Sequence, residues 1–525
     1  MTGNHDLIST VFYLAVFGSF SFVFCKHALH MFQQNRYELY RYTKWLFSKN
    51  NLRLSYGFIY AVTVLAIGTL AGRYGELLCL LVTACFAIYL LYAESKRTYI
   101  KDLVLTNRVK RQIVFMTVLV ILSILAFMNI FKADIIGILM MIVPYLLIYI
   151  MALLTAPLEH LVKKRFENEA RDIISGMDQI VKIGITGSYG KTSTKNIISD
   201  IISDDFYTLI TPASYNTPMG ITRTIREQLK PIHEVFVCEM GADKKGDISY
   251  LMDFVKPRYG VVTSIGPQHL ATFHSIENII NEKMQEIEML PQDGTGFINL
   301  DNEYIRNYRI RNTCKVVSVG IDSKDADFVA SDVKYTKKGS TFTVVYGGKN
   351  YRFSTVLLGK HNITNILLGI AIAVELGIDM KKIVKNVSGV RQVEHRLEVR
   401  QINGLTFIDD AFNSNPAGSK MALDVLEMMD GNRVIVTPGM IDLGEKQSEI
   451  NREFGRYMKD RADYVLLVGR KQTAPIMEGL KDAGFDEEKV LVFDDVKQAF
   501  GYVYAHFTPK DTILLENDLP DAFSV

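Results

Sequence analysis

Apolar residues are distributed unevenly along the chain, and five long apolar stretches come before residue 156. They are Leu7–Cys25, Tyr56–Gly72, Leu77–Tyr92, Ile113–Phe131 and Ile135–Thr155. Each is close to the roughly 17–25 residues with which a helix crosses the hydrocarbon core of a bilayer, and none carries Lys, Arg, Asp or Glu in its interior. Helices buried in a soluble core are usually shorter and amphipathic. The pattern therefore predicts a multi-pass transmembrane region of five helices over residues 1–155.

After Thr155 the pattern changes to short β-like runs that alternate with amphipathic helices. Examples of the runs are Val235–Glu239, Gly260–Ser264, Val434–Thr437 and Tyr464–Val468. This alternation is typical of parallel α/β sheets. Near Asp327–Phe353 two turn-rich segments, at 337–339 and 346–348, separate alternating strands and predict a hairpin insert. We expect a central α/β domain over 156–393 and a C-terminal α/β domain over 394–525.

The charges between the apolar stretches predict their direction. The segments after the first and third stretches are rich in Lys and Arg, whereas the other two connections hold only Arg73 and Lys132. Basic loops lie on the cytoplasmic side of a membrane. We therefore expect the N-terminus outside and everything after Thr155 in the cytoplasm.

Two classes of function become less favourable on charge alone. A net charge of +2 gives no reason to expect a nucleic-acid partner. Ionisable residues inside a membrane usually mark a transport path, and these stretches have none. Anchoring in membrane lipid, or contact with a lipid-linked substrate or a membrane partner, is the better interpretation.

A glycine-rich segment at 186–192, Thr-Gly-Ser-Tyr-Gly-Lys-Thr, follows a buried strand, Val181–Ile185, and precedes a helix that starts near Ser193. Such a turn directs backbone N–H groups at an anion, at the positive end of the helix. Lys191 can reach the β- and γ-phosphates, and the Thr192 hydroxyl can bind Mg²⁺. The strict GxxxxGK[ST] spacing is not met, yet the strand and helix flank the segment as a phosphate loop requires.

The phosphate loop and several later motifs together resemble the Mur ligase family, which builds the peptide of the bacterial cell wall. The resemblance runs from about Lys182 to at least Gly444. The motifs are TGSYGKTS at 186–193, VCEMGA at 237–242, SIGPQHL at 264–270, Lys283, GKHNITN at 359–365, EHRLE at 394–398 and DDAFNSNP at 409–416. The last is most similar to the branch that adds D-alanyl-D-alanine.

The resemblance implies an ATP-dependent ligase that forms an acyl phosphate and captures it with an amine. It implies ATP contacts from residues of both domains, and two Mg²⁺ ions. The implied nucleotide ligands are Thr186, Gly187, Ser188, Gly190, Lys191, Thr192, Ser193, Asn362, Asn365, Arg396 and Asp410. Thr192 and Glu239 would hold one Mg²⁺, and His269 and a carbamylated Lys283 a second. Lys191, Lys283, His269 and Arg396 are the implied catalytic residues, and the C-terminal domain would be Rossmann-like.

Each of these residues also has an ordinary structural interpretation. Glu239 can be a solvated strand end, His269 a hydrogen-bonded loop histidine, and Lys283 an exposed lysine of a charged helix. Asn362 and Asn365 can cap a helix, and Arg396 can pair with Glu394 or Glu398. The order in which the motifs follow the phosphate loop favours the ligase.

The chain departs from the family before the phosphate loop and in two loops. About thirty residues separate Thr155 from Gly187, and they predict a charged helix, Glu159–Ile174. The membrane region therefore takes the place of the family's UDP-binding domain. The segment at 214–220 matches the family's substrate loop only in part, and the one at 511–521 replaces the branch's K-G-S-R segment. Three hypotheses stay open. The chain adds D-alanyl-D-alanine or a similar amino acid to a muramyl-peptide precursor; it acts on a lipid-linked acceptor or as a γ-polyglutamate synthase; or it is a membrane ATPase or sensor.

Overall fold

The chain divides into two compact units, one up to Lys164 and one from Arg165 onwards. The computed structural model describes residues 7–48, 54–96, 99, 102–336, 339–393, 395–411, 415–441, 443 and 446–517.

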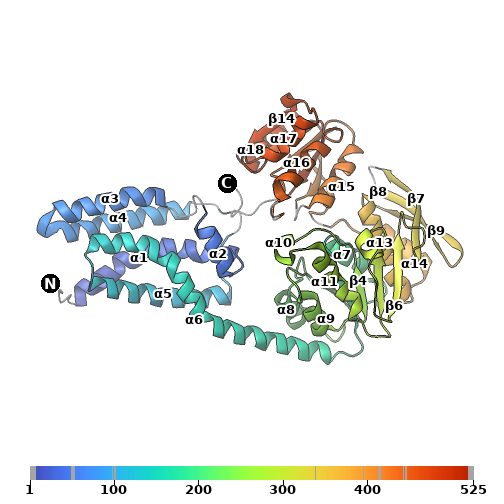
Figure 1. Cartoon of the computed structure of the whole chain (residues 1–525), viewed down its shortest axis with the longest axis horizontal. Coiled ribbons are helices and arrows are strands. Elements are labelled where there is room, and N and C mark those ends of the chain that lie inside the picture. The colour runs from blue at the N-terminus through green and yellow to red at the C-terminus, as the bar shows by residue number, and fades with distance from the viewer. Residues whose placement is uncertain are drawn as a thin grey trace. The chain divides into compact units, whose positions relative to one another are not determined.

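The first unit consists of helices (Figure 1). They are α1 (Leu7–Gln34), α2 (Leu39–Leu46), α3 (Leu54–Leu70), α4 (Gly75–Ser95), α5 (Asn107–Met128) and the first part of α6 (Ala133–Ser175), with a 3₁₀ turn at Gly72–Tyr74. All five predicted apolar stretches are helical. Among the described residues, the four helices α1, α4, α5 and α6 are long and apolar enough to cross a membrane. Helix α3 is equally apolar but has only 17 residues, so the predicted count of five is approximate.

Aromatic side chains fill the interior of this unit. Phe20 of α1 lies 5.1 Å from the ring centre of Tyr60 on α3, and Tyr60 stacks on Phe86 of α4 at 5.0 Å. The outward positions carry large apolar side chains such as Phe58 and Leu153, which are 73% and 68% exposed. Exposed apolar surface of this kind suits a lipid environment.

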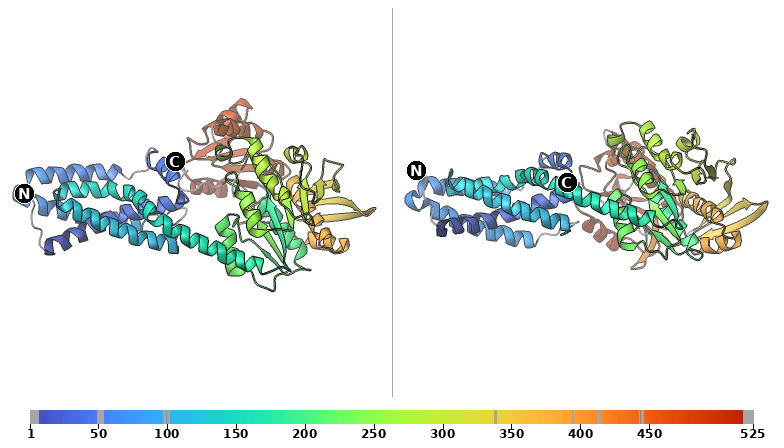
Figure 2. Two further views of the ribbon diagram at one scale, coloured as in Figure 1. Left: turned by 60° about the horizontal axis from the view of Figure 1, so that its bottom comes forward. Right: turned by 90° about the horizontal axis from the view of Figure 1, so that it is seen from below.

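Helix α6 differs from the sequence-based expectation. An apolar span ending at Thr155 and a separate charged helix were expected, but the structure has one continuous helix of 43 residues (Figure 2). Pro144 and Pro157 lie inside it. Proline is tolerated in long membrane helices where neighbouring groups satisfy the freed carbonyls. Its last turns belong to the second unit, where Ala170 and Ile174 are buried in an apolar cluster.

The second unit contains a nine-stranded sheet in the order β2-β3-β1-β4-β5-β6-β7-β8-β9. The strands are β1 (Val181–Thr186), β2 (Thr208–Ile210), β3 (Val235–Glu239), β4 (Tyr259–Val262), β5 (Thr295–Asn299), β6 (Lys315–Gly320), β7 (Phe328–Thr336), β8 (Gly339–Tyr346) and β9 (Lys349–Thr355). All neighbouring strands from β2 to β7 in this order, β1 included, pair in parallel, as the alternation predicts. The phosphate-loop strand β1 is central, between β3 and β4.

Strands β7, β8 and β9 form the predicted antiparallel insert. Gly347 and Gly348 have φ of 57° and 72°, the left-handed values that a tight two-residue hairpin turn requires. The other predicted turn, at Lys337-Lys338, lies outside the described residues.

Helices cover both faces of this sheet (Figure 1). They are α7 (Lys191–Ile202), α8 (Pro218–Gln228), α9 (Asp247–Val255), α10 (Leu270–Phe273), α11 (Ile276–Glu288), α12 (Glu303–Arg306), α13 (Lys360–Glu375) and α14 (Met380–Ser388). One apolar cluster joins α7, α13 and α14 to the sheet, and a second joins α8, α9 and α11 to it.

A six-stranded sheet follows, in the order β10-β11-β15-β12-β13-β14. Its strands are β10 (Glu398–Ile402), β11 (Leu405–Asp410), β12 (Arg433–Thr437), β13 (Tyr464–Val468), β14 (Val490–Phe493) and β15 (Thr512–Glu516); its helices are α15 (Pro416–Glu427), α16 (Gln447–Tyr457), α17 (Ala474–Asp482) and α18 (Val496–His506). All strand pairs except β10–β11 are parallel. This is the second α/β fold that the alternation predicts.

Candidate functional site

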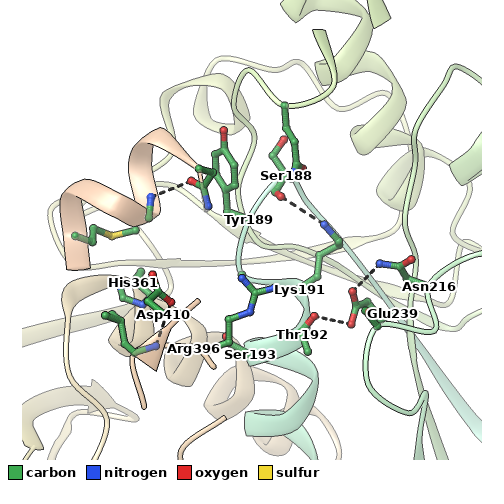
Figure 3. A pocket seen from close by; sticks show the side chains of 17 residues that line it. Ser188, Tyr189, Lys191, Thr192, Ser193, Asn216, Glu239, His361, Arg396 and Asp410 are labelled. Atoms are coloured by element: carbon green, nitrogen blue, oxygen red, sulfur yellow. Dashed lines mark hydrogen bonds between the residues drawn. The ribbon is translucent and has the colours of Figure 1, made fainter. Parts of the chain in front are cut away.

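A cavity of the second unit is lined by loops that follow strands of both sheets (Figure 3). The predicted residues that line it are Ser188, Gly190, Lys191, Thr192, Ser193, Glu239, Arg396 and Asp410. Residues for which the sequence predicts no role of their own also line it: Tyr189, Ser214, Asn216, Gln268, His361, Leu397, Asn415, Gly418 and Met421. Residues far apart in the sequence therefore meet at one place, which the motif order alone could not show.

The glycine-rich loop runs from the end of β1 to the first residue of α7. Gly187 and Gly190 have φ of 150° and 82°, which side chains rarely adopt. A Cβ on Gly187 would lie 2.1 Å from Oγ1 of Thr263, so only glycine fits there. The loop is fixed to the segment that follows β4, because the Ser188 hydroxyl donates to the carbonyl of Gly266 at 3.0 Å. The unpaired N–H groups that begin α7 are a ready site for an anion.

Lys191 is the first residue of α7 and folds back over the loop. Its Nζ donates to the carbonyl of Gly187 at 2.7 Å. Burial lowers the pKa of Lys191; the carboxylate of Glu239 opposes this shift and Arg396 adds to it. The ammonium group is thus held by neutral carbonyls at the mouth of the loop, where a phosphate can replace them.

Glu239 ends β3 and accepts hydrogen bonds on both carboxylate oxygens (Figure 3). Thr192 donates to Oε2 at 2.9 Å and Asn216 to Oε1 at 2.9 Å. The buried Lys195 lies 3.2 Å from Oε2. Burial would raise the pKa of Glu239, but Lys195, Lys191 and these hydrogen bonds hold it below its ordinary value. Glu239 is 1% exposed and ionised, so it is not a solvated strand end.

The second sheet contributes Arg396 and Asp410 to the same cavity. Asp410 ends β11 and accepts from the backbone N–H of Leu397 at 3.1 Å. Burial raises the pKa of Asp410, and the nearby Arg396 opposes the shift. His361, at the start of α13, has its pKa lowered to about 4 by burial and by Arg396, so its ring is neutral at pH 7.

His269 and Lys283 do not line this cavity; both have Asp243 as a neighbour. Nε2 of His269 lies 3.5 Å from Oδ1 of Asp243. Lys283, on α11, is 2% exposed, which excludes the interpretation as an exposed helix lysine. Burial lowers its pKa to about 7, and Lys191 adds to this; Glu282, Asp243 and Asp247 oppose it. Asp243 lies one residue beyond the motif that ends at Ala242, so the sequence analysis did not identify it as a site residue.

Four other predicted residues lie behind the cavity wall. The Thr186 hydroxyl donates to the carbonyl of Met240 at 3.0 Å, and Gly187 packs on Thr263. Asn362, in the first turn of α13, donates from Nδ2 to the carbonyl of Leu358, which precedes the helix, at 2.8 Å. Asn365 lies against Gly190, and its Nδ2 has no hydrogen-bond partner in the described part of the chain.

Within the described residues there is no group of three or more His, Cys, Asp or Glu side chains that could hold a metal ion. Thr192 and Glu239 nevertheless place a hydroxyl and a carboxylate side by side. Mg²⁺ is commonly held by one or two carboxylates together with substrate phosphates and water. The oxygen donors present fit that ion better than a softer metal.

Comparison with known proteins matches both α/β regions of the second unit. The Mur ligase middle domain matches residues 185–373, and the Mur ligase, glutamate ligase domain matches residues 395–516. The chain is 29% identical over 360 residues to the UDP-N-acetylmuramoyl-tripeptide–D-alanyl-D-alanine ligase of Bacillus subtilis, covering 66% of this chain and 77% of that protein. The ligase of the same name from Escherichia coli is 28% identical over 295 residues, 56% of this chain and 65% of that one.

Solved structures show the same fold. MurF from Acinetobacter baumannii has a TM-score of 0.61 at 24% identity, covering 68% of this chain and 77% of that one. MurF ligase from Thermotoga maritima in complex with ADP has a TM-score of 0.62 at 21% identity, covering 69% and 81%.

Proposed function

Because the chain belongs to the Mur ligase family, whose members are ATP-dependent and ADP-forming, we propose that it adds D-alanyl-D-alanine, or a similar amino acid or dipeptide, to a muramyl-peptide precursor. The observation that carries the proposal is the cavity where Lys191, Thr192 and Glu239 of the first α/β region meet Arg396 and Asp410 of the second.

Unpaired polar atoms support the assignment of ATP to this cavity. Nδ1 of His361 and Nδ2 of Asn365 are buried and have no hydrogen-bond partner among the residues that the structure describes. Buried polar groups normally have partners, and a nucleotide offers both donors and acceptors. Ser188, Gly190, Lys191, Thr192 and Ser193 would then hold the phosphates at the N-terminus of α7, with Asn362 behind them and Thr186 and Gly187 shaping the turn.

In the proposed reaction the acceptor carboxylate attacks the γ-phosphoryl group, the bond to ADP breaks and an acyl phosphate forms. The amine then attacks the acyl carbon and inorganic phosphate leaves. Lys191 and Arg396 would place two positive charges where negative charge builds up, which is the usual way proteins accelerate phosphoryl transfer. Thr192 and Glu239 would hold Mg²⁺, which neutralises phosphate charge when bound. Asp410 would orient Arg396.

Lys283 is proposed to carry a carbamate and, with His269, to hold a second Mg²⁺. A carbamate forms when a neutral amine attacks CO₂, and burial lowers the pKa of Lys283 to about 7, so that about half of the amine is neutral at pH 7. The modification would turn a cation beside Lys191 into an anionic oxygen ligand for a hard metal. Asp243, 3.5 Å from His269, is a further oxygen donor at this place.

The acceptor is proposed to be held by the membrane. The family matches begin at residue 185, and the described residues before it include four helices that are long and apolar enough to cross a membrane. A lipid-linked precursor is therefore the favoured form of the muramyl peptide, and a free UDP-linked one the alternative. The same reasoning proposes a multi-pass protein of the cell membrane with cytoplasmic catalytic domains. The fold alone is also that of folylpolyglutamate synthase, so a γ-polyglutamate product stays a second candidate.

The test measures ADP release by the full chain in lipid nanodiscs. Lipid-linked and UDP-linked muramyl peptides are each supplied with and without D-alanyl-D-alanine. We expect ADP only when acceptor and amine are both present, and none with Lys191→Ala. Equal ADP rates with and without any acceptor would instead identify a membrane ATPase or sensor.

A further inference from the structure

A lysine that the proposed mechanism does not use is buried beside Glu239. Lys195, on α7, is fully buried and lies one turn beyond Thr192. Its Nζ reaches two groups at once: Oε2 of Glu239 at 3.2 Å and the carbonyl of Ala213 at 2.5 Å. Burying an ammonium group is costly unless it is paired and hydrogen-bonded. Glu239 therefore has a second buried cation beside it, Lys195, in addition to Lys191.

The loop at 211–217, which this lysine holds, is strained and reaches the cavity. Ala213 has φ of 44°, a left-handed value that is unfavourable for a residue with a Cβ. Ser214 and Asn216 of the same loop line the cavity. Asn216 also binds Oε1 of Glu239. The loop is therefore fastened to this carboxylate twice, directly through Asn216 and indirectly through Lys195.

Close packing leaves the loop little freedom to move apart from Glu239. The N–H of Gly241 donates to the carbonyl of Asn216 at 2.8 Å. A Cβ on Gly241 would lie 2.8 Å from Cγ of Asn216. A shift of the Glu239 carboxylate toward a metal must then change its contacts with Lys195 and with Asn216 of the loop.

We propose that Lys195 is a positioning residue that couples the loop at 211–217 to the metal ligand Glu239, so that occupation of the metal site sets the shape of the acceptor side of the cavity. The inference rests on the proposed function. Lys195 has two separable effects. Its charge opposes the binding of a metal cation at Glu239. Its hydrogen bond to the carbonyl of Ala213 maintains the strained backbone conformation of that residue.

The first measurement is metal binding, with Mn²⁺ as the probe in the presence of ADP. Lys195→Met keeps the volume and removes the charge. We expect Mn²⁺ to bind about tenfold tighter, because a like charge close to the liganding carboxylate is gone. Lys195→Arg, which keeps the charge, should bind Mn²⁺ as the wild type does. Lys182→Met, which removes a half-buried lysine of β1, is the control for general loss of a lysine and should change nothing.

The second measurement is amide hydrogen exchange of residues 211–217 with and without Mg²⁺ and ADP. In the wild type the ligands should change the exchange of this loop, and in Lys195→Met they should not. Adding Ala213→Gly to Lys195→Met should restore the response in part, since glycine adopts the left-handed value without strain. The KM of the acceptor should rise about tenfold in Lys195→Met and recover partly in the double variant.

A merely structural lysine gives a different pattern. Weaker Mn²⁺ binding together with a lower melting temperature, or an unchanged loop response, in Lys195→Met would overturn the proposal. Should that variant not fold, Lys195→Gln is measured in its place and the same two outcomes decide. If the wild type shows no acceptor-dependent ADP release, the proposed function fails, whereas the metal and exchange results still decide the coupling.

Discussion

Lys283 shows how strongly the surroundings of one side chain decide its chemistry. It lies on a helix with several charged residues, yet it is 2% exposed and has Lys191 as a neighbour. Its pKa of about 7 means that the amine is protonated below pH 7 and neutral above it. A neutral amine is nucleophilic toward CO₂, and a protonated one is not.

We expect Lys283→Ala to lower kcat by about 10²–10³, as loss of one preorganised electrostatic group commonly does. Bicarbonate should restore part of the activity of this variant. In CO₂-depleted wild type, recovery at a constant concentration of dissolved CO₂ should become faster between pH 6 and 8, because the neutral fraction of Lys283 rises through its pKa. Asn281→Ala, at an exposed position of the same helix, is the control. Full turnover in Lys283→Ala would remove the carbamate from the mechanism.

At the scale of elements, three glycines fix the position of α11 on the sheet. Gly184, Gly260 and Gly296 lie on the neighbouring strands β1, β4 and β5. A Cβ on Gly184 would lie 2.0 Å from Oε1 of Glu286, and one on Gly260 would lie 2.7 Å from the Glu286 carbonyl. The helix that carries Lys283 therefore sits closer to the strands than side chains would permit.

Gly260→Ala should push α11 off the sheet and lower the free energy of unfolding by about 1–3 kcal/mol, as overpacking does. Activity should fall with it, because Lys283 moves with the helix. Gly501→Ala is the matched control: it lies in α18 with open space around it, and alanine there should raise stability by about 0.5–1 kcal/mol. Urea unfolding of the two variants measures both effects. If both variants changed the free energy of unfolding in the same direction, α11 would not be held on the sheet by the close approach of these glycines.

Much of the fold could be read from the chain, and the exceptions have physical reasons. The strands β3 and β13 agree with their predicted ends because apolar runs between turns carry a clear signal. The fusion of α6 was missed because Pro157 and a change from apolar to charged residues look like a break. Lys195 was missed because only tertiary packing buries it.

At the scale of the whole molecule, the charges of the connections between the apolar helices predict which connections lie in the cytoplasm. We expect alkaline phosphatase inserted after Gly72 or Lys132 to be active, since these connections carry few cations and should lie outside. The enzyme inserted after Phe47 should be inactive, because the basic segment around it should lie in the cytoplasm. Fusion of a fluorescent protein after Phe47 is the complementary control. Activity after Phe47 would reverse the predicted orientation and put the phosphate loop on the wrong side for ATP.

The continuity of α6 also decides where the protein can be cut. Glu169 accepts from Arg226 of α8 at 2.8 Å, and Arg171 pairs with Asp253 of α9 at 3.0 Å. With the buried Ala170 and Ile174, these contacts make the end of α6 a part of the α/β unit. A soluble fragment that starts at Glu159 should unfold cooperatively, whereas one that starts at Asp178 should lose about 2–5 kcal/mol of stability or aggregate. Helix α6 cannot be removed as far as β1 without loss of stability, because its last three turns are also the first element of the enzyme.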